Sequence, residues 1–342
     1  MNLRSIIAAF AISTIATLAA QAQSDPAPAA WDKLVAAAKA EGAVTLYTGL
    51  VGNQTTKKIA AAFQQKYGIR MDILEVRATE LYERLRADKV ANRVLSDVIN
   101  TSGLQTRQFN EDGIVETYGE LPGLAAIIKD VRDIWEDQDI HVPIFTLRYG
   151  LLVNTQLAPD APKTFADLLD PKWKGKILAD DFRAAGGGQT FFSVTLRKFG
   201  RGFHEKLAAQ NVVFMRETRE AERRVARGEF AIYLPFLLNN LPALKGLPVK
   251  AVVLEEGVTY TPYSASLTKS GPHPNAGRLL MVFMISPEAQ ALYAADGLGT
   301  VIDGVSESVP ADLRSLGQPK LLGARIRSDD ETAFAIAKEL YK

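Results

Sequence analysis

The sequence predicts an α/β protein of about two domains. Short apolar stretches with strand character alternate with stretches of helical period along most of the chain, and short connectors favour parallel strands covered by helices. A length of 342 residues suits about two domains. The composition, 47% hydrophobic and 23% charged, is that of an ordinary globular protein and argues against a disordered, collagen-like or coiled-coil chain.

The N-terminal segment predicts a secretory signal peptide. Arg4 supplies a positive charge, residues 6–20 form an apolar run, and Ala20-Gln21-Ala22 is typical of a cleavage site. The alternative is a membrane anchor, but the run is short for a bilayer that needs about 20 apolar residues. We therefore expect cleavage after Ala22 and a soluble exported protein.

Charge balance and cysteine content exclude several classes of partner. The 40 Lys+Arg and 39 Asp+Glu residues give a net charge of +1, which provides no electrostatic footprint for nucleic acid. The absence of cysteine excludes disulfides, thiolate zinc sites, Fe–S clusters and cysteine nucleophiles. We expect no nucleic-acid partner and no cofactor.

The first part of the exported chain predicts a helix followed by a β-α-β-α-β unit. A helix is expected over residues 31–40 because Trp31, Leu34, Val35 and Ala38 share one face, and Gly42 ends it as a C-cap. The elements expected next are a strand over 43–47, an amphipathic helix over 55–67 capped by Gly68, a strand over 69–76, a helix from Thr79 to about Asn92, and a strand over 97–100.

The rest of the chain predicts a second α/β unit. Residues 120–145 have no clear period. Beyond them we expect strands over 148–154, 176–179, 212–215, 230–235 and 249–254, a segment over 260–268 that becomes extended, and helices over 189–199, 219–227, 275–284, 286–294 and 331–340.

Loops at the carboxyl ends of the strands are the expected ligand sites, as in doubly wound sheets. These loops cover residues 47–54, 77–80, 100–103, 180–189, 217–219 and 236–240. In the first of them, Thr48 and Asn53 lie near a helix N-terminus, which suits an anion or a polar oxygen. The alternative is that Asn53 only caps its own helix. The same two interpretations hold for Asn100, Thr101 and Ser102.

The segment Asp180–Gln189 has the most unusual composition. Gly186–Gly188 precede a helix, so backbone amides could approach an anion, and Arg183 could add a forked donor. The alternative is a mobile loop with a solvated arginine. It is not a Walker phosphate loop, because no Lys-Ser/Thr pair closes it. Asp180 and Asp181 could bind a metal, but adjacent carboxylates are more often solvated.

Other side chains carry weaker signals. Arg77 follows a strand and would bind ligand or form a surface salt bridge, and Tyr260 and Tyr263 would form an aromatic wall or ordinary packing. His141, His204 and His273 are expected at the surface. No H-E-x-x-H motif and no G-x-S-x-G motif occurs, which counts against a hydrolase.

Several motifs together resemble one known family. They are a Trp-containing first helix, Glu41–Gly49 (EGAVTLYTG), Phe63–Ile69 (FQQKYGI), the strand Asp97–Asn100, Tyr149–Thr155 (YGLLVNT), Pro162–Lys176 (PKTFADLLDPKWKGK), Gly228-Glu229, Pro274-Asn275 and Ser286–Gln290 (SPEAQ). The sequence resembles the type II periplasmic solute-binding proteins that serve ABC importers, and most of all the ferric-iron-binding branch and its relatives.

The resemblance implies a fold, a location and partners. The fold would have two α/β lobes joined by crossing strands, with lobe 1 over 31–145 and 262–302, and lobe 2 over 146–261 and 303–342. A small solute would bind in the cleft, the lobes would close by a hinge motion, and a membrane permease would recognise the closed form. The protein would be periplasmic, monomeric and not an enzyme. A secreted α/β enzyme is the alternative from another class.

The nature of the ligand depends on departures from the iron-binding pattern. Iron-binding members carry a Tyr-Tyr pair, because phenolates suit a hard cation; Leu238-Asn239 stands in its place here, and the first loop holds Leu50–Asn53 with no histidine. A small organic anion is therefore preferred, and ferric iron or a ferric–anion complex near Tyr47, Tyr260 or Tyr263 is the alternative. The expected ligand-binding residues are Tyr47, Thr48, Asn53, Arg77, Asn100, Thr101, Arg183, Gly187, Gln189, Phe236 and Tyr260.

Overall fold

The computed structural model describes residues 28–50, 53–76, 78–316 and 319–342. The predicted signal peptide and Arg77 therefore lie outside the described residues. The helices are α1 Pro28–Glu41, α2 Gln54–Tyr67, α3 Ala78–Val90, α4 Gly103–Glu111, α5 Lys129–Arg132, α6 Gly187–Phe199, α7 Arg201–Ala208, α8 Thr218–Ala226, α9 Pro274–Met284, α10 Pro287–Ala295, α11 Ala311–Arg314 and α12 Asp330–Leu340. In these ranges no helix is both long and apolar enough to cross a membrane.

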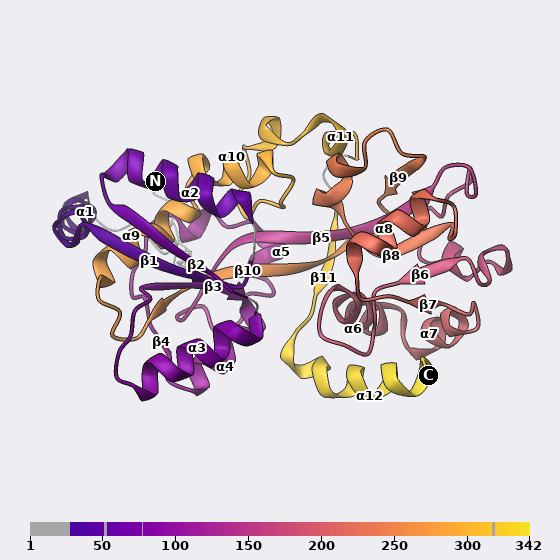
Figure 1. The fold of residues 1–342 in the computed structure, drawn as a ribbon, viewed down its shortest axis with the longest axis horizontal. Helices are drawn as coiled ribbons and strands as arrows, with labels where there is room; N and C mark the ends of the chain where they lie inside the picture. Colours follow the sequence, from indigo (N-terminus) through magenta and orange to yellow (C-terminus); the bar gives the residue numbers. More distant parts are fainter. Residues whose placement is uncertain (1–27, 51–52, 77, 317–318) are drawn as a thin grey trace, which may run out of the picture.

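The strands form one mixed sheet that runs through both halves of the molecule. They are β1 Ala43–Thr48, β2 Arg70–Glu75, β3 Val98–Ser102, β4 Val115–Glu116, β5 Val142–Asn154, β6 Ile177–Ala179, β7 Val213–Phe214, β8 Ile232–Leu237, β9 Val249–Val252, β10 Val258–Thr268 and β11 Leu321–Ala324. The main order is β2-β1-β3-β10-β5-β8-β6-β7. The long strands β5 and β10 pair antiparallel and cross from one half to the other (Figure 1).

The apolar core divides into two groups of clusters, which define two lobes. In lobe 1, α1, α2, α9 and α10 bury residues such as Phe63 and Phe283 on one face of the sheet, while α3 and α4 bury Leu81 and Phe109 on the other. In lobe 2, α6, α7 and α12 cover one face and α8 covers the other. Because separate clusters lie in each half, each lobe has its own core. Each large apolar side chain buried there stabilises the fold by roughly 1.5–3 kcal/mol.

Helix α2 illustrates how the local sequence sets an element. Asn53 is its N-cap and accepts a 2.8 Å hydrogen bond from the Thr55 N–H, and Gly68 ends it at a φ of 72°, a left-handed conformation that glycine adopts without strain. Ile59 and Phe63, one turn apart, are buried against the sheet. This helix matches its prediction from the sequence.

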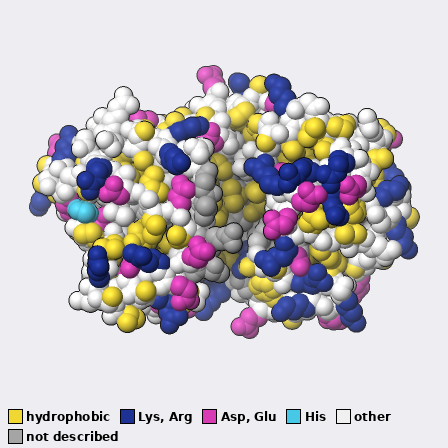
Figure 2. Space-filling view, in the orientation of Figure 1, with side chains coloured by type: hydrophobic (Ala, Val, Ile, Leu, Met, Phe, Trp, Pro, Cys, Tyr) yellow, Lys and Arg dark blue, Asp and Glu magenta, His cyan; other side chains and the backbone are white. Residues whose placement is uncertain are grey.

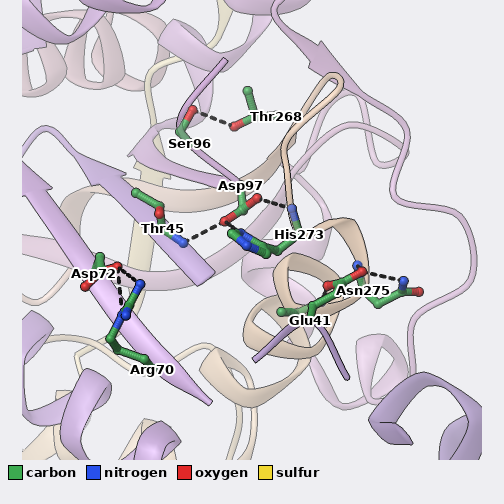
Figure 3. Close-up of polar contacts among 10 residues, drawn as sticks. Glu41, Thr45, Arg70, Asp72, Ser96, Asp97, Thr268, His273 and Asn275 are labelled. Carbon is green, nitrogen blue, oxygen red and sulfur yellow. Dashed lines mark hydrogen bonds and ion pairs between the residues drawn. The ribbon is translucent and has the colours of Figure 1, made fainter. Parts of the chain in front are cut away.

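A carboxylate from one helix caps another in lobe 1 (Figure 3). Glu41, at the end of α1, accepts hydrogen bonds from the backbone N–H groups of Asn275 (3.2 Å) and Ala276 (2.7 Å) in the first turn of α9. A negative charge at a helix N-terminus is favourable, typically by 0.3–1 kcal/mol. The contact fixes the first helix against a segment more than 200 residues away.

The predicted β-α-β-α-β unit is confirmed, since β1 pairs in parallel with both β2 and β3. Helices α4 and α7 were missed: they are short, with 9 and 8 residues, and only two or three of the residues in each are buried. Strand β5 begins at Val142, not at 148, because its first residues gain their extended form by pairing with distant β10. The surface placement of two histidines was wrong: His204 is fully buried and His141 is 5% exposed.

Candidate functional site

A cleft of about 670 Å³ lies where the lobes meet. Figure 2 shows acidic and basic side chains mixed over both lobes. The lining residues come from β3 and α4, from the segment around α5, from the crossing strands, and from the start of α6. They are Thr101–Gln105, Arg107, Gln108, Glu111, Val131, Ile134–Glu136, His141, Pro143, Leu147, Tyr149, Ala185–Gly187, Thr190, Thr261–Ser264, Arg325 and Arg327.

A line of hydroxyl groups lies along the crossing strands in the cleft. The Tyr149 hydroxyl is 3.2 Å from Thr261 Oγ1, which is 3.2 Å from Thr190 Oγ1 on α6. Burial raises the pKa of Tyr149 well above its usual range, so its hydroxyl stays protonated. Hydroxyls both donate and accept, so this line can bind polar oxygens of a solute without a formal charge.

The wall from lobe 1 is the N-terminus of α4. Ser102 occupies the N-cap position, but its side chain makes no hydrogen bond to the first turn. Gly103 follows, and a Cβ added there would lie 3.2 Å from His141 Cε1 and 3.7 Å from Ser264 Oγ. The unsatisfied N–H groups at a helix start carry partial positive charge and favour anions.

The wall from lobe 2 is the glycine segment before α6, and a carboxylate of the protein already fills its helix N-terminus. Asp180 accepts hydrogen bonds from the N–H groups of Gly188 (2.7 Å) and Asp181 (2.9 Å). Burial is the main cause that raises the pKa of Asp180, and these donors oppose it. A Cβ on Gly187 would lie 3.0 Å from Tyr149 Cε1, and one on Gly188 only 2.6 Å from the Asp180 carbonyl oxygen, so close approach requires glycine here.

The arginines that line the cleft are engaged with partners. Arg107 pairs with Glu136 (2.9 Å) and Asp137 (2.5 Å). Arg327, between β11 and α12, pairs with Glu111 of α4 at 2.6 Å, which links the two lobes. The guanidinium of Arg325 lies 5.7 Å from the centre of the Phe334 ring. The cleft therefore contains basic groups, but acidic neighbours neutralise part of the positive charge of Arg107 and Arg327.

The structure brings a minority of the expected site residues into the cleft. Thr101, Gly187 and Tyr263 line it, and Tyr263 stacks on Phe145 with ring centres 5.1 Å apart. Asn53 and Asn100 border a separate cavity of about 10 Å³. The first-loop alternative that Asn53 caps its own helix is observed in the structure.

Arg183 does not reach the cleft. It forms an ion pair with Asp181 (2.8 Å), donates to the Tyr341 carbonyl oxygen (2.9 Å), and lies over the Phe214 ring at 4.8 Å. These three contacts use its forked donor group within lobe 2. The glycines and the arginine are adjacent in sequence, but the backbone turn directs them to different places.

The remaining expected residues pack inside the lobes. Thr48 Oγ1 donates to Asn100 Oδ1 at 3.1 Å, Gln189 and Phe236 are fully buried, Tyr47 lies 3.4 Å from Asp88 Oδ2, and Tyr260 donates to the Asp130 carbonyl oxygen at 3.0 Å. Tyr47 and Tyr260 thus do not join Tyr263 in one ligand set, and burial raises the pKa of all three, which disfavours phenolates. Within the described residues, no group of three or more His, Cys, Asp or Glu could hold a metal.

Sequence reasoning missed the cleft residues on the crossing strands. Tyr149, Thr261 and Ser264 follow no loop and fit no motif with a known chemistry, and His141 was assigned to the surface. The one sequence signal for these residues is the Tyr-rich segment around Pro262, where Tyr260 and Tyr263 were expected to form an aromatic wall or ordinary packing. Their convergence depends on the antiparallel pairing of β5 with β10.

Comparison with known proteins identifies solute-binding proteins as relatives of this chain. The model of one protein family, described as "Bacterial extracellular solute-binding protein", matches residues 44–299. A "Putative 2-aminoethylphosphonate-binding periplasmic protein" of Salmonella typhimurium is 24% identical over 240 residues, which cover 67% of this chain and 68% of that protein.

Solved structures share the fold over most of the chain. A Trichodesmium protein in complex with iron and citrate has a TM-score of 0.74 at 18% identity and covers 88% of this chain and 100% of its own. The periplasmic binding protein AfuA from Actinobacillus pleuropneumoniae, with fructose-6-phosphate bound, has a TM-score of 0.63 at 22% identity and covers 88% and 96%. The architecture described above is thus that of type II periplasmic binding proteins.

Proposed function

This chain belongs to the bacterial extracellular solute-binding protein family, and we propose that it is the binding component of an ABC importer for a small organic anion. The solute would be a carboxylate, a phosphonate or a phosphorylated compound. The observation that carries the proposal is the cleft of about 670 Å³ between two lobes joined by β5 and β10. Small-molecule sites commonly occupy clefts of 300–1,000 Å³.

The groups that line the cleft support the proposal that the solute is an anion. They include a helix N-terminus without a side-chain cap, at Ser102, and the hydroxyls of Tyr149, Thr190 and Thr261. Donors that point into a partly buried cleft favour charged oxygens. Two relatives point in the same direction, a putative 2-aminoethylphosphonate-binding protein and one with a sugar phosphate bound, whereas the relative with iron and citrate bound favours the ferric alternative.

The proposal includes a mechanism of transport. Lobe 1 would comprise residues 31–145 and 262–302, and lobe 2 residues 146–261 and 303–342, with the crossings of β5 and β10 as hinges. Solute would bind in the open cleft, the lobes would close around it, and a membrane permease would recognise the closed form. The protein would act in the periplasm as a monomer after cleavage behind Ala22. The family is one of solute-binding proteins, and we assign no catalytic residue.

Native mass spectrometry of residues 23–342, purified without refolding, tests the ligand class. A mass excess that matches an organic acid, phosphonate or sugar phosphate supports the proposal. An excess that matches iron, with or without an anion such as citrate, supports the alternative of a ferric-binding protein. If the protein is bare, a panel of 2-aminoethylphosphonate, fructose-6-phosphate, citrate and ferric citrate is added in a thermal-shift assay, because a ligand bound only by the native state raises stability.

Small-angle scattering tests the mechanism with the same samples. Lobe closure around a bound solute should reduce the radius of gyration. Identical scattering profiles with and without a saturating solute would contradict hinge closure. Turnover of any of these solutes would favour the secreted-enzyme alternative.

A further inference from the structure

We infer that the N-terminus of α4 is the subsite that holds a phosphonate or phosphate group of the solute, with Ser264 Oγ as its side-chain donor. This inference rests on the proposed function and makes it more specific. It assigns the anionic end of the solute to lobe 1, although the sequence pointed to the glycine segment and arginine of lobe 2. The place is defined by Gly103, the first residue of the helix.

The start of α4 faces the cleft without a side-chain cap. Ser102, Gly103 and Leu104 all line the cleft, and the N-cap side chain of Ser102 makes no hydrogen bond to the helix. The helix has 9 residues, so its peptide dipoles add over more than two turns. An oxyanion placed at Gly103 would accept from the backbone N–H groups that no intrahelical carbonyl satisfies.

An independent observation comes from Ser264. Its side chain is fully buried, and its hydroxyl has no hydrogen-bond partner in the described structure. The residue lines the cleft, and Oγ lies 3.7 Å from the position that a Cβ on Gly103 would take. A buried hydroxyl without a partner is unfavourable, and this one lines the cleft, which points to a bound group that the hydroxyl would serve.

The His141 ring packs against Gly103 at the start of α4. Its Cε1 and Nε2 lie 3.2 and 3.7 Å from the same Cβ position, and the residue is 5% exposed. Burial is the main cause that lowers its pKa to about 4, so the ring is neutral at neutral pH. A neutral imidazole carries one N–H donor, and that of His141 is already bound to the backbone of Glu136. A side chain at 103 would press on this ring, so glycine allows the close packing of the helix start against His141.

The corresponding place in lobe 2 is already occupied. The N-terminus of α6 receives the carboxylate of Asp180, which accepts the Gly188 N–H at 2.7 Å. A solute anion there would displace this carboxylate or lie beside its negative charge, which is unfavourable at short range. The first turn of α6 thus already has one N–H group bound to a carboxylate, whereas the N-cap side chain of α4 accepts none.

Amide NMR with methylphosphonate as the probe tests the subsite on the ¹⁵N-labelled protein. We expect saturable shifts of the Gly103 and Leu104 amides. Ser264→Ala should weaken the affinity about tenfold or more, the effect of one hydrogen bond to a charged group. It removes no internal hydrogen bond, so the variant should fold as the wild type does.

Ser266→Ala is the matched control. Ser266 lies two residues further along β10, is also fully buried and also has a hydroxyl without a partner, but it does not line the cleft. It should bind methylphosphonate like the wild type. Gly103→Ala gives a second variant. Its new Cβ would lie 3.2 Å from His141 Cε1 and would disturb the helix start, so it should abolish the shifts.

Three outcomes would overturn the inference: no saturable shift at Gly103, shifts centred on Gly187 and Gly188, or equal affinities of Ser264→Ala and Ser266→Ala. A solute that closes the lobes without shifting Gly103 would overturn the subsite and leave the proposed function intact. Methylphosphonate binding at Gly103 in a protein whose lobes close on no solute would overturn the proposed function and leave the subsite.

Discussion

Asp97 and His273 are joined by two hydrogen bonds although they lie 176 positions apart: Oδ1 accepts the His273 backbone N–H at 2.6 Å, and Oδ2 lies 3.0 Å from the ring Nδ1. Oδ2 also accepts the Thr45 N–H at 2.7 Å (Figure 3). Asp97 is fully buried. One carboxylate therefore holds β1, β3 and the start of α9 together.

Removing this carboxylate should destabilise lobe 1 strongly. Asp97→Ala leaves the N–H groups of Thr45 and His273 without their acceptor, at about 1–3 kcal/mol for each buried group. We expect the free energy of unfolding to fall by roughly 3 kcal/mol in urea titrations. Asp72→Ala is the control, because its ion pair with Arg70 is exposed on both sides and such pairs contribute about 0–1 kcal/mol. Equal effects of the two substitutions would contradict this role for Asp97.

Stability should decrease in acid because of buried His204. Its ring nitrogens lie 2.9 Å from Thr195 Oγ1 and 3.1 Å from the Tyr341 hydroxyl, and burial is the main cause that lowers its pKa to about 3. In the unfolded chain the pKa is about 6.5, so between about pH 6.5 and 3 only the unfolded chain takes up this proton. The free energy of unfolding is therefore lost as the pH falls through this window, by up to about 1.4 kcal/mol per pH unit, and is fully retained above it.

Urea titrations at a series of pH values check this prediction. His204→Gln should show a flatter decline between pH 6.5 and 4 than the wild type, whatever its stability at pH 7. His141→Gln should do the same, because burial also lowers the pKa of His141, to about 4. Parallel curves for wild type and His204→Gln would show that His204 is not the group that titrates.

The Tyr149 hydroxyl should contribute to solute binding. Tyr149→Phe removes the first member of the hydroxyl line with Thr261 and Thr190, and we expect about tenfold weaker binding in isothermal titration calorimetry. Tyr293→Phe is the control, since Tyr293 is buried in the core of lobe 1 and does not line the cleft. Unchanged affinity of Tyr149→Phe would remove this hydroxyl from the site.

The charge of Asp180 should weaken anion binding across the cleft. Asp180→Asn keeps an oxygen that can accept the Gly188 N–H but removes the negative charge behind Gly187. We expect the affinity for an anionic solute to rise about three- to tenfold, because repulsion between like charges is strong in a partly buried site. Asp72→Asn, at an exposed position of β2, should have no effect in the same titration. A loss of affinity in Asp180→Asn would show instead that the carboxylate contacts the solute.

The fold could be predicted further than the site. The β-α-β-α-β unit follows from local apolar periods, and caps such as Asn53 and Gly68 mark where α2 begins and ends. Helix α4 was missed because it has only 9 residues and buries only Thr106 and Phe109. Yet α4 forms one wall of the cleft, so a helix that was missed in the sequence carries the proposed subsite.

The site residues fail to follow from local sequence for a geometric reason. Arg183 lies five residues from Gly188, but it pairs with Asp181 and the Tyr341 carbonyl oxygen away from the cleft. Thr261 meets Tyr149 across 112 positions of sequence. A contact between residues so far apart in the sequence cannot be predicted from a local sequence pattern.

The sequence by itself determined the α/β class and the family motifs, because these depend on residue periods and short segments that each element carries within itself. Only the tertiary structure decided which side chains share the cleft. The crossing of β5 and β10 brings Ser264 and His141 to Gly103, and the Asp180 carboxylate accepts the Gly188 N–H at the start of α6, where the sequence predicted an anion of the solute. These contacts depend on strand register and on the packing of two lobes, which are properties of the whole chain.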